Sequence, residues 1–215
     1  MIQRIVSLLL FMAMVVAIAS GQERTVVIQL SAPDTLGGMP LMQVFKERKS
    51  TRAFDEKKSL SDTTLADLLW AAFGVNRADG KRTAPSARNR QEISLYLCMK
   101  NGVFVYNAPE HSLTQVSPED LSMQAGMQEY VAQAPLNIIY VADMSQANAS
   151  SAEETSFYLG ADCGFIAENV YLYCASAGLA TVVRGSVDRA SLGQALKLSP
   201  NQRILLAQTV GHGKD

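Results

Sequence analysis

The stretch "EETSFYLGADCGFIAENVYLYCASA", residues Glu153–Ala177, is the longest run with a helical pattern and decides the fold. Its apolar residues fall on most faces of a helix, which is typical of a helix at the centre of a domain. Cys163 and Cys174 share this helix, eleven residues and therefore about 16 Å apart, which is too far for a disulfide. With Cys98 they are interpreted as buried packing residues.

Shorter elements surround this helix, and they do not alternate strictly between strand and helix. One core is expected, because 215 residues are too few to argue for two large domains. The pattern favours an α+β sandwich over a doubly wound sheet. The sequence predicts strands over 24–30, 93–99, 103–107, 135–143 and 203–213, and helices over 40–49, 61–74, 117–133 and 188–198.

The first twenty residues form a separate object. Arg4 precedes an apolar run from Ile5 to Ala19, and Ala17 and Ala19 fit the small-x-small cleavage pattern. Residues 1–20 are therefore predicted to be a signal peptide, so that the mature domain of residues 21–215 is exported, either periplasmic or secreted. An uncleaved membrane anchor is the weaker alternative, because fifteen residues fall short of the ~20 that span a bilayer. No membrane association is expected after cleavage.

Several function classes are disfavoured by what the sequence lacks. A net charge of -1 gives no support for nucleic-acid binding as the main activity. With two histidines and three scattered cysteines, no metal site is expected, and no G-x-S-x-G or G-x-G-x-x-G motif occurs. The stretch "GVNRADGK" has five residues between Gly74 and Gly80 where a phosphate loop requires four. A protein without such motifs can still catalyse a reaction through a bound organic cofactor.

The stretch "RKSTRAF", Arg48–Phe54, places three cations and two hydroxyls in five consecutive residues. One interpretation is a solvated helix end, where basic side chains offset the helix dipole. The other is a preformed anion site. Two further donor-rich segments are potential partners for it, "RTAPSARNRQ" at Arg82–Gln91 and "GLATVVRGSVD" at Gly178–Asp188.

At these segments the sequence resembles the FMN-dependent nitroreductase family, closest to the branch with the azoline-oxidising (thiazole- or oxazole-forming) dehydrogenases. The resemblance spans about residues 41–214. It implies an α+β sandwich with a mainly antiparallel sheet flanked by helices, in an intertwined homodimer with FMN at the subunit boundary. It also implies ping-pong transfer from NAD(P)H through the flavin to a nitroaromatic, quinone or other conjugated acceptor. The matching stretches are "RKSTRAF", "LSDTTLADLLWAAFGV", "KRTAPSARNRQEISLYL", "NGVFVYNAPEHSL", "AQAPLNIIYVAD", "GLATVVRGSVDRASLGQALKLSPNQ" and "VGHGK".

The resemblance implies cofactor-binding roles for the basic stretch. Arg48 and Ser50 are expected to bind the phosphate and ribityl end of FMN through charge-assisted and neutral hydrogen bonds. Arg52 is expected near the N1 and C2-carbonyl edge, where a fixed cation stabilises negative charge and tunes the flavin. Lys214 is a further candidate for the phosphate. The alternative for Arg48 and Arg52 is that both are solvated.

The resemblance also implies roles in the other two segments. Pro85, Ser86 and Asn89 of the partner subunit are expected to line the isoalloxazine, although Ser and Asn also commonly shape turns. Backbone N–H groups of Arg184 and Gly185 are expected to reach flavin N5 and O4, and a glycine allows such close approach. No side chain is expected to act as a catalytic acid or base.

Two departures from the family pattern bear on function. Glu92 stands where relatives often have proline, and we find no equivalent of the Lys-Tyr pair that serves proton removal in the azoline oxidases. The second departure argues against peptide oxidation. The sequence therefore predicts an FMN-dependent NAD(P)H oxidoreductase with a small-molecule electron acceptor. The alternative, favoured by the signal peptide, is an exported flavin-binding module without turnover.

Overall fold

A seven-stranded antiparallel sheet forms the centre of the domain. The computed structural model describes residues 26–147 and 149–214, so the expected signal peptide lies outside the described residues. The strand order is β1-β4-β3-β2-β5-β7-β6, and every neighbouring pair is antiparallel. The strands are β1 Val27–Gln29, β2 Ile93–Met99, β3 Gly102–Asn107, β4 Ser112–Ser117, β5 Leu136–Asp143, β6 Ala180–Arg184 and β7 Gln202–Gly211.

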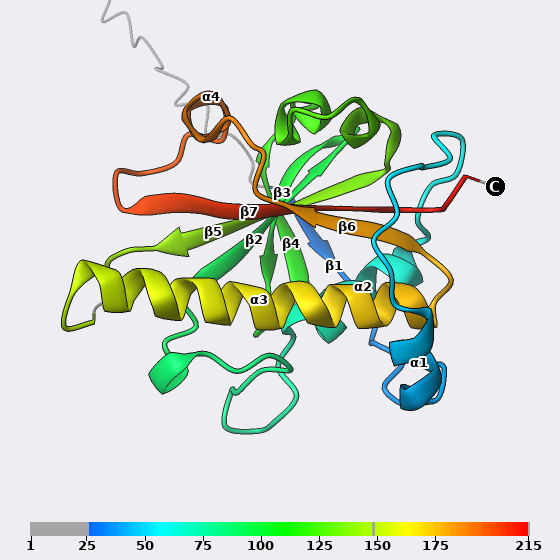
Figure 1. Ribbon diagram of the computed structural model, residues 1–215, viewed down its shortest axis with the longest axis horizontal. Helices are drawn as coiled ribbons and strands as arrows, with labels where there is room; N and C mark the ends of the chain where they lie inside the picture. Colours follow the sequence, from blue (N-terminus) through cyan, green and yellow to red (C-terminus); the bar gives the residue numbers. More distant parts are fainter. Residues whose placement is uncertain (1–25, 148, 215) are drawn as a thin grey trace, which may run out of the picture.

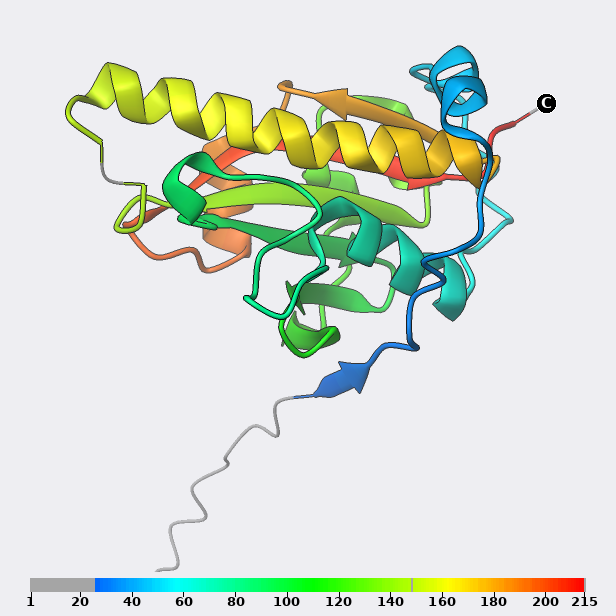
Figure 2. The same cartoon turned by 90° about the horizontal axis from the view of Figure 1, so that it is seen from below.

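Helices cover both faces of this sheet (Figure 1). The long helix α3 (Ala152–Ser176) and α2 (Asp62–Phe73) pack on one face, around buried residues such as Leu97 and Ile138. On the other face lie α4 (Arg189–Ala195) and two 3₁₀ turns, η2 (Ser122–Ala125) and η3 (Glu129–Gln133). Figure 2 shows α1 (Leu41–Glu47) beside the C-terminal end of α3. The predicted α+β class with an antiparallel sheet is confirmed.

The strongest sequence patterns are the elements that the structure reproduces. Helix α3 matches its predicted range to within a residue at each end, and β2, β3, β5 and β7 lie where strands are predicted. Ser61 caps α2 by accepting a hydrogen bond from Thr64 N, and Gly74 ends it. Cys98, Cys163 and Cys174 are buried free thiols, as predicted. Burial raises the pKa of Cys98 and of Cys163 to about 12, so both stay protonated at neutral pH.

The predicted helix over residues 117–133 is wrong. Ser117 is the last residue of β4, and the two short turns η2 and η3 are separated by an extended Gly126 with φ -178°. The buried side chain of Arg184 lies against this break, since a Cβ on Gly126 would lie 2.5 Å from its Nε. Its guanidinium donates to Ala125 O, the acceptor that a continuous helix would use for its own backbone hydrogen bond.

Three strands also differ from the prediction. Strand β4 and strand β6 were not predicted as strands, and β1 covers only three residues of the predicted 24–30. Strands β1 and β6 are the two edges of the sheet, each paired with one neighbouring strand, whereas β4 lies between β1 and β3. Within residues 26–147 and 149–214, no helix is both long enough and apolar enough to cross a bilayer.

Candidate functional site

The basic stretch begins at Arg48, the C-cap of α1, and continues as an extended segment along the outer side of β6. Helix α1 stops at Glu47, and Thr51 N then donates to Thr181 O of β6 at 2.9 Å. Further on, Phe54 forms a β-bridge with Gly213, next to the C-terminus of the described chain. Successive side chains of an extended segment point to opposite sides. Arg48, Ser50 and Arg52 therefore share one side of the segment.

Tyr171 on α3 joins this segment to β6. Its hydroxyl lies 2.8 Å from Ser50 Oγ and accepts a hydrogen bond of 2.9 Å from Val183 N. The Arg48 guanidinium stacks over the Tyr171 ring, 5.3 Å from its centroid. The structure therefore brings Arg48 and Ser50 to the strand that ends in Arg184. Sequence reasoning missed Tyr171, because a tyrosine among apolar residues of a central helix has the pattern of a core residue.

The cations of the segment form no ion pair with the described residues. In the part of the chain that the structure describes, the ion pairs are Lys58–Asp55 at 3.4 Å and Lys81–Asp79 at 2.7 Å, both local. No carboxylate there pairs with Arg48, Lys49, Arg52 or Lys214. Lys214 joins the cluster because its N–H donates to Ala53 O at 3.1 Å. Four uncompensated cations on one edge create a positive potential that favours an anionic ligand.

Of two cavities in the described part of the chain, one lies beside these cations and the other does not. A cavity of about 400 Å³ lies between the segment, the end of α3 and β6, lined by residues that include Lys49, Thr51 and Lys214. Arg48, Ser50 and Arg52 are not among its lining residues, but Tyr171, which Arg48 and Ser50 contact, is one of them. A larger cavity of about 520 Å³ lies against β1, and no predicted site residue lines it. We place the candidate site at the cation cluster, because charge and donor geometry converge there and not at the larger cavity.

The end of β6 offers backbone donors. In the described part of the chain, the Gly185 N–H donates to no acceptor. The nearest atom to a Cβ built on Gly185 is Leu206 Cδ2 at 3.9 Å, so the backbone is open to close approach. Ser186 O, one residue on, accepts a hydrogen bond from Met127 N at 3.4 Å. The strand end is thereby held to the turns on the far face of the sheet.

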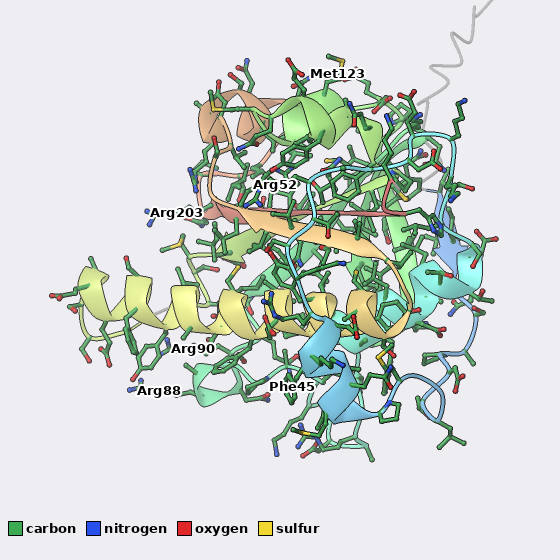
Figure 3. The ribbon with its side chains drawn as sticks, turned by 45° about the vertical axis from the view of Figure 1, so that its right-hand side comes forward. Phe45, Arg52, Arg88, Arg90, Met123 and Arg203 are labelled. Atoms are coloured by element: carbon green, nitrogen blue, oxygen red, sulfur yellow. The ribbon has the colours of Figure 1, made fainter. Side chains whose placement is uncertain are left out.

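The Arg184 side chain is structural. It is buried, donating to Thr209 Oγ1 and Ala125 O at 2.7 Å each and to Asn137 Oδ1 at 3.1 Å. Burial lowers the pKa of Arg184 to about 10, so it stays charged at neutral pH. Any cofactor contact of this residue must therefore use its backbone. Figure 3 shows Arg52 beside β6, on the side of the sheet away from α3.

The loop with Pro85, Ser86 and Asn89 lies elsewhere along α3. It is fixed there by Asp162, whose Oδ2 accepts a hydrogen bond of 2.9 Å from Ala87 N. Asp162 and Tyr171 are nine residues apart on the helix, or about 14 Å along its axis. A single chain thus does not bring this loop to Arg48 and Ser50.

Comparisons with known proteins identify the class. The model of the family described as "Nitroreductase family" matches residues 45–212, most of the chain. The chain therefore belongs to the nitroreductase family of oxidoreductases. A candidate nitroreductase of Methanocaldococcus jannaschii is 28% identical over 188 residues, covering 83% of this chain and 94% of the relative.

Solved structures agree with this assignment. A crystal structure of a candidate nitroreductase from Ralstonia eutropha JMP134 has a TM-score of 0.83 at 39% identity, covering 88% of this chain and 90% of that one. A structure of the E. coli microcin synthetase McbBCD complex with truncated pro-MccB17 has a TM-score of 0.68 at 17% identity, covering 86% of this chain and 78% of that one. At that identity the likeness shows the fold alone.

Proposed function

We propose that this chain is an FMN-dependent oxidoreductase that transfers electrons from NAD(P)H to a small conjugated acceptor, such as a nitroaromatic or a quinone, in a ping-pong cycle. The observation that carries the proposal is the row of uncompensated cations at Arg48, Lys49, Arg52 and Lys214 beside the open end of β6. FMN, when bound, supplies the hydride and electron transfer for which the protein has no side-chain apparatus of its own.

The residues of this edge fit an FMN molecule. A phosphate dianion and a polyol chain need cations and hydroxyl donors, which Arg48 and Ser50 provide from one side of an extended segment. Tyr171 orients both of these side chains through the contacts at 2.8 Å and 5.3 Å. The unused Gly185 N–H provides a donor for a ring heteroatom, and Arg52 a cation for the ring edge that gains negative charge.

The loop of Pro85, Ser86 and Asn89 is proposed to serve the site of a second copy, because it lies about 14 Å along α3 from Tyr171 in its own chain. Helix α3 offers a surface for that second copy. Phe157 and Phe165 are 70% and 49% exposed. A Cβ built on Gly160 or Gly164 meets nothing within 4 Å, which leaves room for close packing of another backbone.

Charge and neighbouring residues also favour this surface as a homodimer interface. Glu168 is the single exposed charged residue between Phe157 and Leu172. Helix α1, next to the C-terminal end of α3, exposes Leu41, Met42 and Phe45. Monomeric proteins seldom leave such apolar surface uncovered. Phe45 projects from α1 at the front of the molecule in Figure 3.

The proposed acceptor is a small molecule, and the proposed location of the mature domain is outside the cytoplasm, after removal of residues 1–20. A peptide substrate is disfavoured, because the sequence has no equivalent of the Lys-Tyr pair of the azoline oxidases. An exported flavin-binding module without turnover remains the second candidate, since export separates the protein from cytoplasmic NAD(P)H.

Anaerobic reduction separates these two functions. We expect the FMN-loaded protein to lose its visible absorbance within seconds to minutes when NADH or NADPH is added without oxygen, and to regain it when a quinone follows. Full bleaching by dithionite, with no response to either nicotinamide, would support the module without turnover and overturn the proposed activity. Free FMN at the same concentration is the control for direct reduction.

A further inference from the structure

Two buried carboxyl groups meet beneath the loop that carries Pro85, Ser86 and Asn89. Glu92 directly precedes β2, Asp162 lies on α3, and each residue is 3% exposed. Besides burial, the Asp162 carboxyl raises the pKa of Glu92 through hydrogen bonding and charge, so the two side chains are neighbours in this buried site. Glu92 Oε2 is buried without a hydrogen-bond partner among the described residues. Two carboxylates in such contact repel each other unless one of them holds a proton.

Asp162 connects this pair to the loop. Its Oδ2 accepts the hydrogen bond from Ala87 N, which begins the turn η1 (Ala87–Asn89). Three residues that follow have left-handed backbones, with φ of 56° at Arg88, 54° at Asn89 and 51° at Gln91. Non-glycine residues adopt this conformation at a cost, so the surrounding contacts must hold them there.

Few other contacts hold the loop. Ser86 Oγ accepts a hydrogen bond from Gln91 N at 2.9 Å, and the Gln91 side chain bonds Asn89 Oδ1 and Gly80 O at 3.1 Å each. These contacts lie within the loop and its neighbouring turn. The hydrogen bond from Ala87 N to Asp162 is the one that ties the loop to α3.

We propose that Glu92 is a positioning residue: its protonated carboxyl donates a hydrogen bond to Asp162, which keeps Asp162 on Ala87 N and holds the strained loop in its FMN-binding form. The effect on FMN binding rests on the proposed function, whereas the contact between Glu92 and Asp162 does not. Ionisation of Glu92 places two negative charges side by side in a buried site. The charges separate, Ala87 N loses its acceptor, and the loop relaxes.

The surroundings of Glu92 set the pH range of this change. Burial raises the pKa of Glu92 to about 7, and the hydrogen bond and charge of Asp162 act in the same direction. Its backbone N–H and the charge of Arg90 oppose this rise. Asp143, at the end of the adjacent β5, turns its carboxylate to Ser145 and Gln146. Glu92 thus changes charge close to physiological pH, where an ordinary glutamate is already ionised.

The sign of the effect on stability follows from linkage. Glu92 has a higher pKa in the folded chain than in the unfolded chain, so the stability it contributes is complete below pH ~4.5. That stability is lost as the pH rises through about 7. Glu92→Gln keeps a hydrogen-bond donor and cannot ionise. We compare the midpoint of thermal unfolding of the two FMN-free proteins. Between pH 5.5 and pH 8, we expect the midpoint of the wild type to fall by roughly 5 °C more than that of Glu92→Gln.

A control and a second variant keep this test decisive. Glu119→Gln neutralises an exposed glutamate and should follow the wild type at each pH. If Glu92→Gln does not fold, Asp162→Asn serves instead. It keeps Glu92 but removes the neighbouring charge, so the chain with Asp162→Asn should lose stability at a different pH from the wild type, with its pH profile no longer parallel. The proposal would be overturned if the unfolding midpoint had the same pH dependence in the wild type and in whichever of these two variants folds.

FMN binding tests the consequence for the loop. The flavin phosphate itself titrates near pH 6, so wild type and Glu92→Gln are compared at the same pH. We expect the FMN dissociation constant to rise roughly tenfold more in the wild type than in Glu92→Gln between pH 6 and pH 8. FMN binding with identical pH dependence in both would overturn the proposal. No FMN binding at any pH would refute the proposed function instead, while the unfolding profiles still decide the role of Glu92.

Discussion

Arg52→Ala is expected to weaken FMN binding by roughly 10- to 100-fold and to lower the reduction potential of the bound flavin. A charge-assisted hydrogen bond contributes about 1.5–3 kcal/mol, and each 1.4 kcal/mol is a factor of ten in affinity. Arg52 is exposed and has no ion-pair partner in the described residues, so its removal should leave the fold intact. FMN titration and a dye-linked potential measurement give the two readouts.

Arg203→Ala is the matched control for this variant. Arg203 is also an exposed arginine without an ion pair in the described residues, at the start of β7 and away from the basic segment (Figure 3). Its loss changes the net charge equally, and we expect the wild-type affinity and potential. Equal losses in both variants would indicate a general charge effect. Wild-type values in Arg52→Ala would contradict its role at the flavin.

Phe165→Glu is expected to convert the protein to a monomer and to abolish stoichiometric FMN binding. Phe165 lies on the exposed apolar face of α3, where a buried carboxylate without a partner would strongly disfavour association. Loss of FMN should accompany loss of the dimer, because the loop of Pro85, Ser86 and Asn89 is proposed to complete the site of the other copy. Analytical ultracentrifugation tests the mass, which should fall from that of two chains to that of one.

Met123→Glu controls for the introduction of a charge on an exposed apolar residue. Met123 is 79% exposed on η2, on the face of the sheet opposite to α3. We expect this variant to remain a dimer with wild-type FMN content. A Phe165→Glu protein that is monomeric yet holds one FMN per chain would refute the shared site. A dimeric Phe165→Glu protein would refute the α3 interface.

Most of the fold follows from local pattern. The central helix and β5 are long apolar runs whose burial is readable directly, and α2 carries its capping residues Ser61 and Gly74 in sequence. The segment 117–133 could not be predicted in the same way. Its course depends on Arg184, some sixty residues later, whose guanidinium bonds Ala125 O and fills the space beside Gly126.

The site is only partly readable from sequence. The basic stretch is recognisable in the sequence as a candidate anion site, but its extended course beyond Arg48 is not, and the flavin roles of its residues stay predictions. Tyr171 and Asp162 were missed because each belongs to a helix whose pattern indicates a core. The available signal for Asp162 was a carboxylate in the apolar pattern of a central helix; the structure shows that it is buried. Glu92 carried a different signal, its departure from the proline that is common in the family.

The most direct test is the visible spectrum of the purified mature chain, residues 21–215, before and after incubation with FMN and removal of the unbound coenzyme. We predict the visible absorbance of a bound flavin, with about one FMN per chain in a dimer. A well-folded protein that stays colourless after incubation would contradict the cation segment as a flavin site.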